Sequence, residues 1–223
     1  VELWGVVDVA VRHTNNEGAA KTGLTKMIGG GMSQSRWGIN VEEDLGGGSK
    51  ALAFLENRFD ADAGNPAIGA PFFQLSYVGL QGPYGRLTAG RQWNVLFDVV
   101  TSTYASFPYS PYMEAYKPEL GMAAGARTSN MLKYLFATPD RSLVGALQYS
   151  FDENNNTKGL TSATQIPGFV ASTLNGGAWE TVGGYLRYAA AGAAVGGGYL
   201  RTTLPGGTDV DAWTLGGSYR TGP

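Results

Sequence analysis

The 223-residue sequence contains no cysteine and a single histidine, His13. Without cysteine the chain can form neither disulfide bonds nor thiolate sites. One histidine cannot supply the ligand set of a zinc or other transition-metal site. Hydrolytic sites need a Ser/His or Asp/His constellation, whereas His13 ends an alternating segment beside a polar stretch. We therefore expect a protein that is not an enzyme and that binds no metal and no cofactor.

Charged residues and long apolar runs are also scarce. Asp, Glu, Lys and Arg make up 15% of the chain, against about a quarter in ordinary globular domains. The formal net charge of −2 provides no basic field that would attract nucleic acid. No apolar run approaches the ~18 residues that a transmembrane helix needs. Neither a nucleic-acid partner nor a helical membrane anchor is expected.

The sequence is instead rich in glycine and aromatic residues, with 34 Gly, 12 Tyr and 5 Trp. Apolar and polar residues alternate along most of it, which is the period-2 pattern of a strand with two different faces. In one such segment Trp37, Ile39 and Val41 share the apolar face. Ten strands are predicted, over residues 1–12, 36–42, 51–60, 73–80, 85–91, 127–136, 143–151, 179–190, 194–203 and 210–219. No helix is expected outside the central segment 93–126.

The connections between the predicted strands alternate in length. Short joints are expected at 44–48, 81–84, 138–141 and 190–192. Longer ones are expected at 14–33, 61–71, 93–126, 152–178 and 204–209. Short turns would then gather at one end of an antiparallel up-and-down sheet, and long loops at the other. This asymmetry is typical of an all-β transmembrane β-barrel, whereas a soluble sandwich or propeller need not show it.

The two faces of the predicted strands support the same interpretation. Aromatic residues lie near many strand ends, as in the interfacial girdles of a membrane barrel. They are Trp4, Trp37, Phe59, Tyr77, Tyr134, Phe136, Tyr149, Phe151, Trp213 and Tyr219. Core packing in a soluble β-domain is the alternative. The opposite faces carry charges of both signs, which favours a water-filled lumen.

The central segment 93–126 interrupts the alternation. It contains three prolines, several aromatic residues and two carboxylates, Glu114 and Glu119, that no strand pattern claims. Loops this long inside a domain are usually functional or disordered, and the aromatic content argues against disorder. We therefore predict a loop that folds back and packs against the wall of the sheet.

Four segments carry a family resemblance: GVVDV at the N-terminus, SRWGINVEEDLGGGSKALAFLEN (35–57), SYVGLQGPYGRLTAGRQ (76–92) and RTSNMLKYLFATP (127–139). They resemble the general trimeric porins of Gram-negative outer membranes, most of all those of the beta-proteobacterial branch. The resemblance implies a 16-stranded barrel whose third external loop folds inward and narrows the pore. It also implies a homotrimer in the bacterial outer membrane, in contact with membrane lipid and lipopolysaccharide. With about ten strands present, residues 1–223 are expected to form the N-terminal two-thirds of a single β-barrel domain.

Permeation requires a wet channel with charges that select among ions, and the resemblance points to a basic wall. Its candidates are Arg36, Arg91 and Arg127 at positions that match the family, Lys133 on the strand face of Arg127, and Arg58 on the polar face of its strand. Strict alternation would turn Arg91 toward lipid, so a β-bulge at Gly90 is expected to re-aim it. An ordinary interfacial arginine is the alternative for Arg91. A structural ion pair in the lumen is the alternative for Arg36 and Arg127.

The acidic side of the expected constriction comes from the loop. Residues 118–121, Pro-Glu-Leu-Gly, resemble the Pro-Glu-Phe-Gly-Gly motif of the porin constriction loop, so Glu119 matches the family carboxylate. Glu114 lies one residue from the position of a second acid, and Gln74 stands where some relatives have arginine. The expected function is a channel for passive diffusion of ions and small hydrophilic solutes, with a preference for anions. The alternative is a structural or adhesin-type outer-membrane barrel whose loop plugs the lumen.

Overall fold

The computed structural model describes residues 1–66, 72–103, 126–152, 180–203 and 208–220. In these ranges the chain forms thirteen β-strands and one α-helix. The strands are β1 (Glu2–Val6), β2 (Val9–Glu17), β3 (Thr22–Gly29), β4 (Arg36–Gly46), β5 (Ser49–Asp60), β6 (Asn65–Pro66), β7 (Phe73–Gly82), β8 (Gly85–Trp93), β9 (Arg127–Ala137), β10 (Leu143–Ser150), β11 (Thr181–Ala190), β12 (Ala193–Thr203) and β13 (Asp209–Tyr219). The helix α1 spans Val95–Thr103. None of the described residues belongs to a helix long and apolar enough to cross a membrane.

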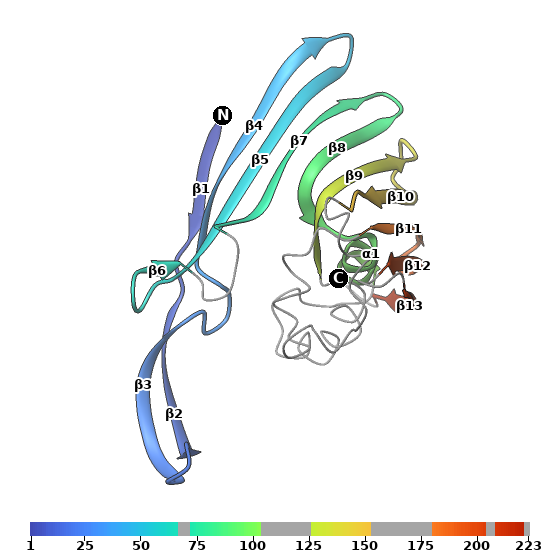
Figure 1. Cartoon of the computed structure of the whole chain (residues 1–223). Helices are drawn as coiled ribbons and strands as arrows, with labels where there is room; N and C mark the ends of the chain where they lie inside the picture. The colour runs from blue at the N-terminus through green and yellow to red at the C-terminus, as the bar shows by residue number, and fades with distance from the viewer. Residues whose placement is uncertain (67–71, 104–125, 153–179, 204–207, 221–223) are drawn as a thin grey trace.

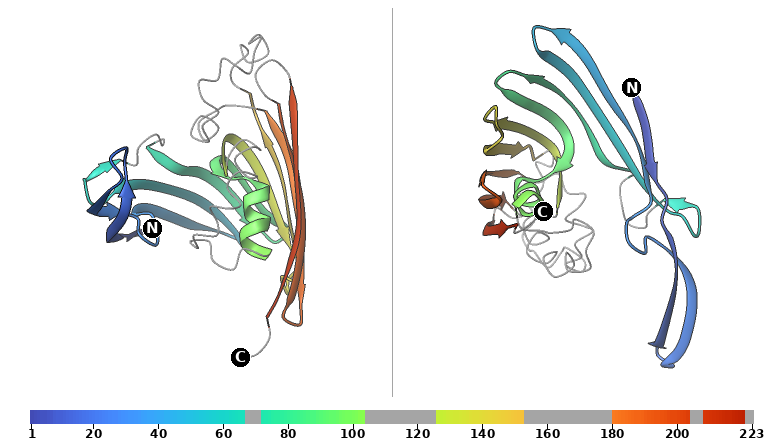
Figure 2. Two further views of the ribbon diagram at one scale, coloured as in Figure 1. Left: turned by 90° about the horizontal axis from the view of Figure 1, so that it is seen from below. Right: turned by 180° about the vertical axis from the view of Figure 1, so that it is seen from behind.

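Ten strands form one antiparallel sheet, in the order β1-β4-β5-β7-β8-β9-β10-β11-β12-β13. They correspond to the ten predicted segments, so the up-and-down order is confirmed. The short strand β6 pairs with β5, and β2 pairs with β3 as a separate hairpin. The sheet curves into an arc around α1 (Figures 1 and 2). Within the described ranges β1 and β13 are its two edges.

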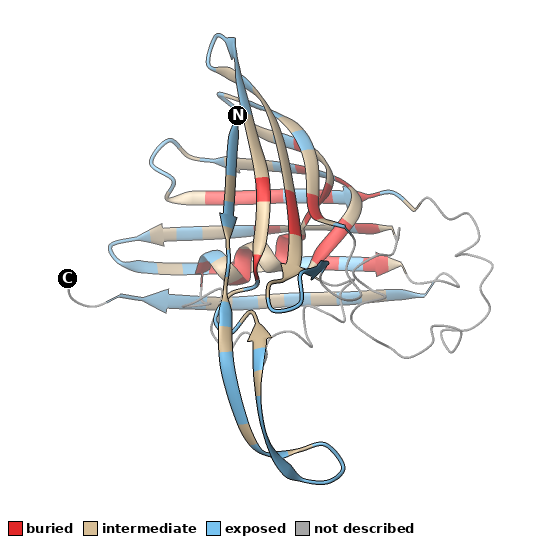
Figure 3. Cartoon of the chain, turned by 90° about the vertical axis from the view of Figure 1, so that its left-hand side faces the viewer, coloured by how far each residue is buried: buried red, intermediate tan, exposed pale blue. Residues whose placement is uncertain are grey.

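Burial along the strands is the reverse of that in a soluble protein (Figure 3). On β10, Leu147 is 61% exposed, whereas the neighbouring Gln148 is 3% exposed. On β11, Val182 is exposed and the preceding Thr181 is buried. Apolar side chains thus face outward and polar ones inward, the alternation expected of a barrel wall in lipid. This pattern contradicts the alternative of a soluble β-domain built around an aromatic core.

The helix α1 packs against the concave side of the sheet, mainly on β11, β12 and β13. Its apolar face joins buried residues of the wall in a small core of Val95, Leu96, Val99, Val100, Val144, Ala146, Tyr185 and Leu200. A Cβ added at Gly196 of β12 would lie 2.7 Å from Thr103 Oγ1, so glycine there permits the close approach. The described part of the central segment therefore folds inward, as predicted.

Both ends of α1 are held by side chains. Asn94 Oδ1 accepts a hydrogen bond from the Phe97 N–H at 2.8 Å, as an N-cap residue does. Gln148 of β10 accepts the Val95 N–H at 2.8 Å. At the C-terminal end, Arg187 Nε donates to the Ser102 carbonyl at 3.0 Å, where a cation also complements the helix dipole. Backbone groups at the two ends of α1 that have no partner inside the helix are thus bound by side chains of the wall.

One predicted connection is wrong. Residues 14–33 were expected to be a loop after a strand over 1–12, but the strand breaks at Val7–Asp8 and the chain continues as the β2–β3 hairpin. The Asp8 carboxylate accepts hydrogen bonds from the N–H groups of Ser33, Met32 and Gly31 at 2.7, 2.9 and 3.0 Å. These backbone bonds hold the pKa of Asp8 below its ordinary value. The break arises because Asp8 binds backbone that follows it by more than twenty residues, a contact that local alternation does not reveal.

Candidate functional site

The base of the central loop is closed by two residues that face each other across β8 and β9. Trp93 is the register partner of Arg127, and the Asn94 N–H donates to the Ala126 carbonyl at 3.0 Å. The Arg127 guanidinium carbon lies 3.7 Å from the centroid of the Trp93 ring. The Phe97 ring stacks on the same indole at 3.8 Å, with an interplanar angle of 9°. Two groups this close to one centroid must occupy opposite faces, so Phe97, Trp93 and Arg127 form a three-layer stack.

Two buried arginines have donors without a partner in the described ranges. Arg127 is 6% exposed and Arg91 is 8% exposed, and Nε and Nη2 of both lack a hydrogen bond there. Nη1 of Arg91 donates to Ser129 Oγ at 2.9 Å. Nε and Nη2 form the guanidinium edge that binds an oxyanion, and Arg201 uses it to hold Asp211 at 2.8 and 3.1 Å. In Arg91 and Arg127 this edge is buried and has no hydrogen-bond partner within the described ranges.

A bulge is present beside Arg91, but the prediction that it lies at Gly90 is wrong. Between the pairs Gly90–Met131 and Gln92–Thr128, Arg91 alone stands opposite Ser129 and Asn130, so the extra residue lies on β9. The ladder between β7 and β8 is regular at Gly90 and Arg91. Gly90 has a φ of 131°, and a Cβ there would lie 2.3 Å from the Ser76 carbonyl oxygen, so only glycine fits. Leu87 is exposed on the outer face, whereas Arg91 is buried and bound to Ser129. Arg91 is therefore kept from lipid by burial and by its bond to Ser129 of the bulged strand β9.

Arg36 and Arg58 share one carboxylate. Glu56 is buried and lies 3.0 Å from Arg58 Nε and 3.8 Å from Arg36 Nε. Gln34 also holds both, because its side chain accepts from Arg58 and its carbonyl accepts from Arg36 at 3.1 Å. The structural ion pair considered for Arg36 is thus present. Arg36, Arg58 and a third arginine, Arg91, all act electrostatically on Arg127, and within the described ranges Glu56 opposes them there.

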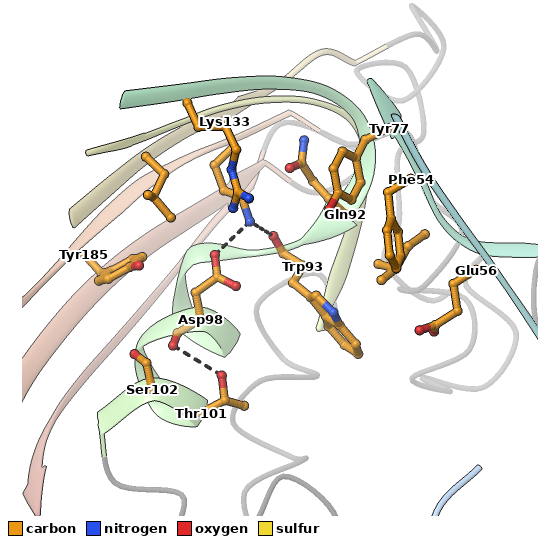
Figure 4. Close-up of a pocket in the computed structure, with 13 residues that line it drawn as sticks. Phe54, Glu56, Tyr77, Gln92, Trp93, Asp98, Thr101, Ser102, Lys133 and Tyr185 are labelled. Atoms are coloured by element: carbon orange, nitrogen blue, oxygen red, sulfur yellow. Dashed lines mark hydrogen bonds and ion pairs between the residues drawn. The ribbon is translucent and has the colours of Figure 1, made fainter. Parts of the chain in front are cut away.

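Lys133 anchors the helix. Its ammonium group donates to Asp98 Oδ2 and to the Trp93 carbonyl, both at 2.8 Å. Figure 4 shows both bonds, one to Asp98 of α1 and one to the last residue of β8. Asp98 was missed in the sequence, although an acid in the first turn of a helix that starts at Val95 is a usable signal. The Lys133 charge is paired here, whereas Nε and Nη2 of Arg91 and Arg127 have no hydrogen-bond partner within the described ranges.

A cavity of about 420 Å³ opens between α1 and the wall (Figure 4). Its lining combines aromatic rings with charges of both signs. The lining residues are Phe54, Glu56, Leu75, Tyr77, Arg86, Gln92, Trp93, Asp98, Thr101, Ser102, Lys133, Leu135 and Tyr185. Arg86 was not among the sequence candidates. Alternation would have found it, because Arg86 shares the inner face of β8 with Thr88.

Two of the predicted residues, Glu114 and Glu119, lie outside the described ranges. The acidic side of the expected constriction therefore stays a prediction. Gln74 lies within β7 and is buried. Of the basic candidates, the structure brings Arg36, Arg58, Arg91 and Arg127 together and pairs Lys133 with the loop helix.

Comparison with known proteins agrees with the fold. The family model for Gram-negative porins matches residues 1–223. The outer membrane porin protein 32 of Delftia acidovorans is 31% identical over the whole chain, which covers 60% of that relative. An outer membrane porin protein of Bordetella pertussis is 30% identical over 70% of the chain and 43% of its own length. The chain thus spans about 60% or less of the length of these relatives.

Solved porin structures have a similar fold. An anion-selective porin from Comamonas acidovorans superimposes with a TM-score of 0.73 and 28% identity, over 98% of this chain and 63% of that one. OmpF of Salmonella typhi, solved with daunomycin, has a TM-score of 0.64 at 17% identity, over 99% of this chain and 62% of that one. At that identity the second match concerns the fold alone.

Proposed function

The chain belongs to the Gram-negative porin family, and from this premise we propose that it lines a water-filled channel for passive diffusion of ions and small hydrophilic solutes, with a preference for anions. It is an outer-membrane β-barrel protein and not an enzyme. The similarity to an anion-selective porin supports the direction of the preference.

The observation that carries the proposal is the cluster of Arg36, Arg58, Arg91 and Arg127, in which Nε and Nη2 of Arg91 and Arg127 are buried and have no hydrogen-bond partner within the described ranges. A buried donor without a partner costs free energy, and the cost is larger for a charged group. Because these donors are shielded from solvent, the cluster acts on a passing anion through its charge. Both side chains lie where the inward loop leaves the wall, so a solute that passes the loop passes them.

Local charge outweighs the net charge of −2 in this setting. The screening length is about 8 Å at physiological salt, so only charges near the passage act strongly on a permeating ion. A pair of unit charges ~4 Å apart in an effective dielectric near 20 interacts by about 4 kcal/mol before desolvation. Within the described ranges, four arginines are opposed at this point of the channel by one carboxylate, that of Glu56. This excess of positive charge therefore favours anions over cations.

The remaining features of the channel follow from the family. Glu119 and Glu114 on the loop 93–126 form the acidic side of the constriction and set up a transverse field with the basic wall. The protein assembles as a homotrimer, in contact with membrane lipid and lipopolysaccharide. Chemical crosslinking and native mass in mild detergent test the trimer, and a monomer as the sole species contradicts it.

Conductance in planar bilayers tests the function. Purified protein should open discrete channels, and under a KCl gradient the reversal potential should move toward the chloride equilibrium potential. A barrel plugged by its own loop, the structural or adhesin alternative, would insert without conducting. Channels that favour potassium would contradict the anion preference while leaving the channel itself established.

A further inference from the structure

The cavity beside α1 has a wall of stacked aromatic rings. The Phe54 and Tyr77 rings, on register-paired residues of β5 and β7, lie 5.5 Å apart with an interplanar angle of 19°. Trp4 of β1 continues the row, 5.9 Å from Phe54 at 28°. To reach Phe54 the Trp4 ring passes over Gly38 of β4, where a Cβ would lie 2.7 Å from the indole. The row thus depends on a glycine in the intervening strand.

Further aromatic side chains complete the lining. Trp93 and Tyr185 border the same cavity, from β8 and β11. A volume of about 420 Å³ falls in the range of small-molecule sites, which are mainly apolar and aromatic with a few polar groups that fix orientation. Planar rings gain from offset or edge-to-face contact with such side chains. The cavity is therefore suited to a planar ring.

The charges of the cavity are paired except for one. Glu56 is bound by Arg58, and Asp98 by Lys133. Arg86 has no ion-pair partner within the described ranges, yet its charge acts on Asp98, Tyr77 and Tyr185. A guanidinium that lines a cavity together with aromatic side chains is complementary to a carboxylate carried on a ring.

We propose that this cavity is a binding site for aromatic carboxylates, with the ring against Phe54 and Tyr77 and the carboxylate on Arg86. The inference rests on the proposed function, since the solute reaches the cavity through the channel. It goes beyond a general anion preference, because it requires discrimination by ring planarity between solutes of equal charge.

Benzoate and cyclohexanecarboxylate are the probes, since they share a carboxylate and a six-membered ring but differ in planarity. Their binding to detergent-solubilised protein is measured by saturation-transfer NMR, and their block of chloride current in bilayers is measured separately. We expect benzoate to bind about three- to tenfold more tightly. Equal binding of the two acids would overturn the proposal.

Two changes locate the site. Arg86→Gln should weaken benzoate binding about tenfold or more, whereas Arg141→Gln, an exposed arginine at a short turn, should not. The double variant Phe54→Leu/Tyr77→Leu should bind both acids equally, whereas Trp213→Leu on the outer face should retain the difference. Unchanged benzoate binding in Arg86→Gln would refute the role of Arg86. Arg86→Lys, which keeps the charge, replaces that variant if it fails to fold.

The two arms separate this inference from the proposed function. Channels that prefer chloride but bind the two acids equally would refute only the aromatic site. Preferential benzoate binding in detergent, together with channels that show no anion preference, would support the site and refute the selectivity.

Discussion

Replacing Trp93 with leucine removes the aromatic face on which the Arg127 guanidinium lies. The indole is held between Arg127 at 3.7 Å and Phe97 at 3.8 Å. It therefore holds in place both the Arg127 guanidinium, which is proposed to select anions, and the helix α1. A cation–π contact in a desolvated setting is worth about 2 kcal/mol, which corresponds to roughly a thirtyfold change in population. Arg127 should leave its stacked position, because its Nε and Nη2 have no hydrogen bond within the described ranges that would retain it.

The reversal potential under a KCl gradient is the assay. Trp93→Leu should lose much of the chloride preference although no charge has changed, and Trp93→Phe should restore it because a ring face is present again. Thermal unfolding separates this effect from instability, since both variants lose part of the stack with Phe97. If Trp93→Leu kept the wild-type reversal potential, Arg127 would not depend on the indole and the reasoning would be refuted.

Three other residues give further tests. Asp98→Asn leaves a buried ammonium without its carboxylate, so we expect a loss of about 3 kcal/mol in unfolding free energy and noisier single-channel currents; quiet currents would mean that other contacts hold the helix. Gly196→Ala places a Cβ 2.7 Å from Thr103 Oγ1, so α1 should move into the lumen, with lower conductance and about 1–3 kcal/mol less stability. The pKa of Asp8 is lowered, above all by the Ser33 N–H, so its stabilisation is present above the ordinary carboxyl pKa of 3.8 and is lost as the pH falls through the lowered value. Amide exchange at Ser33, corrected for intrinsic rates, should accelerate at low pH in the wild type and show no such step in Asp8→Asn.

The local pattern of apolar and polar residues was sufficient to predict most strands of the barrel wall. Alternation reveals the ten strands of the main sheet because each residue's side in a strand is fixed by its parity. Arg91 stood on the wrong side of that parity, which indicated an irregularity at this point. Its place on the partner strand β9 could not be predicted, because it depends on how the two strands pair. The inward packing of the central segment also followed, since its aromatic residues need a surface to cover.

Contacts between distant residues could not be predicted in this way. Asp98 meets Lys133 across 35 positions, and Asp8 binds backbone 23 to 25 positions away. Both contacts depend on the tertiary fold, which brings distant segments together and cannot be inferred from a short stretch of sequence. For the same reason the sequence predicted Lys133 as a charge of the pore wall and not as the partner of Asp98. It also explains why the segment that forms the β2–β3 hairpin was predicted to be a loop.

The reversal potential of the double variant Arg91→Gln/Arg127→Gln tests the selectivity most directly. The matched control is Arg141→Gln/Arg201→Gln, which removes the same charge from a short turn and from the outer face. Under a KCl gradient the control should stay near the chloride equilibrium potential, and the filter variant should move toward zero. A filter variant that keeps the wild-type reversal potential would contradict the assignment of Arg91 and Arg127 as the anion-selecting residues.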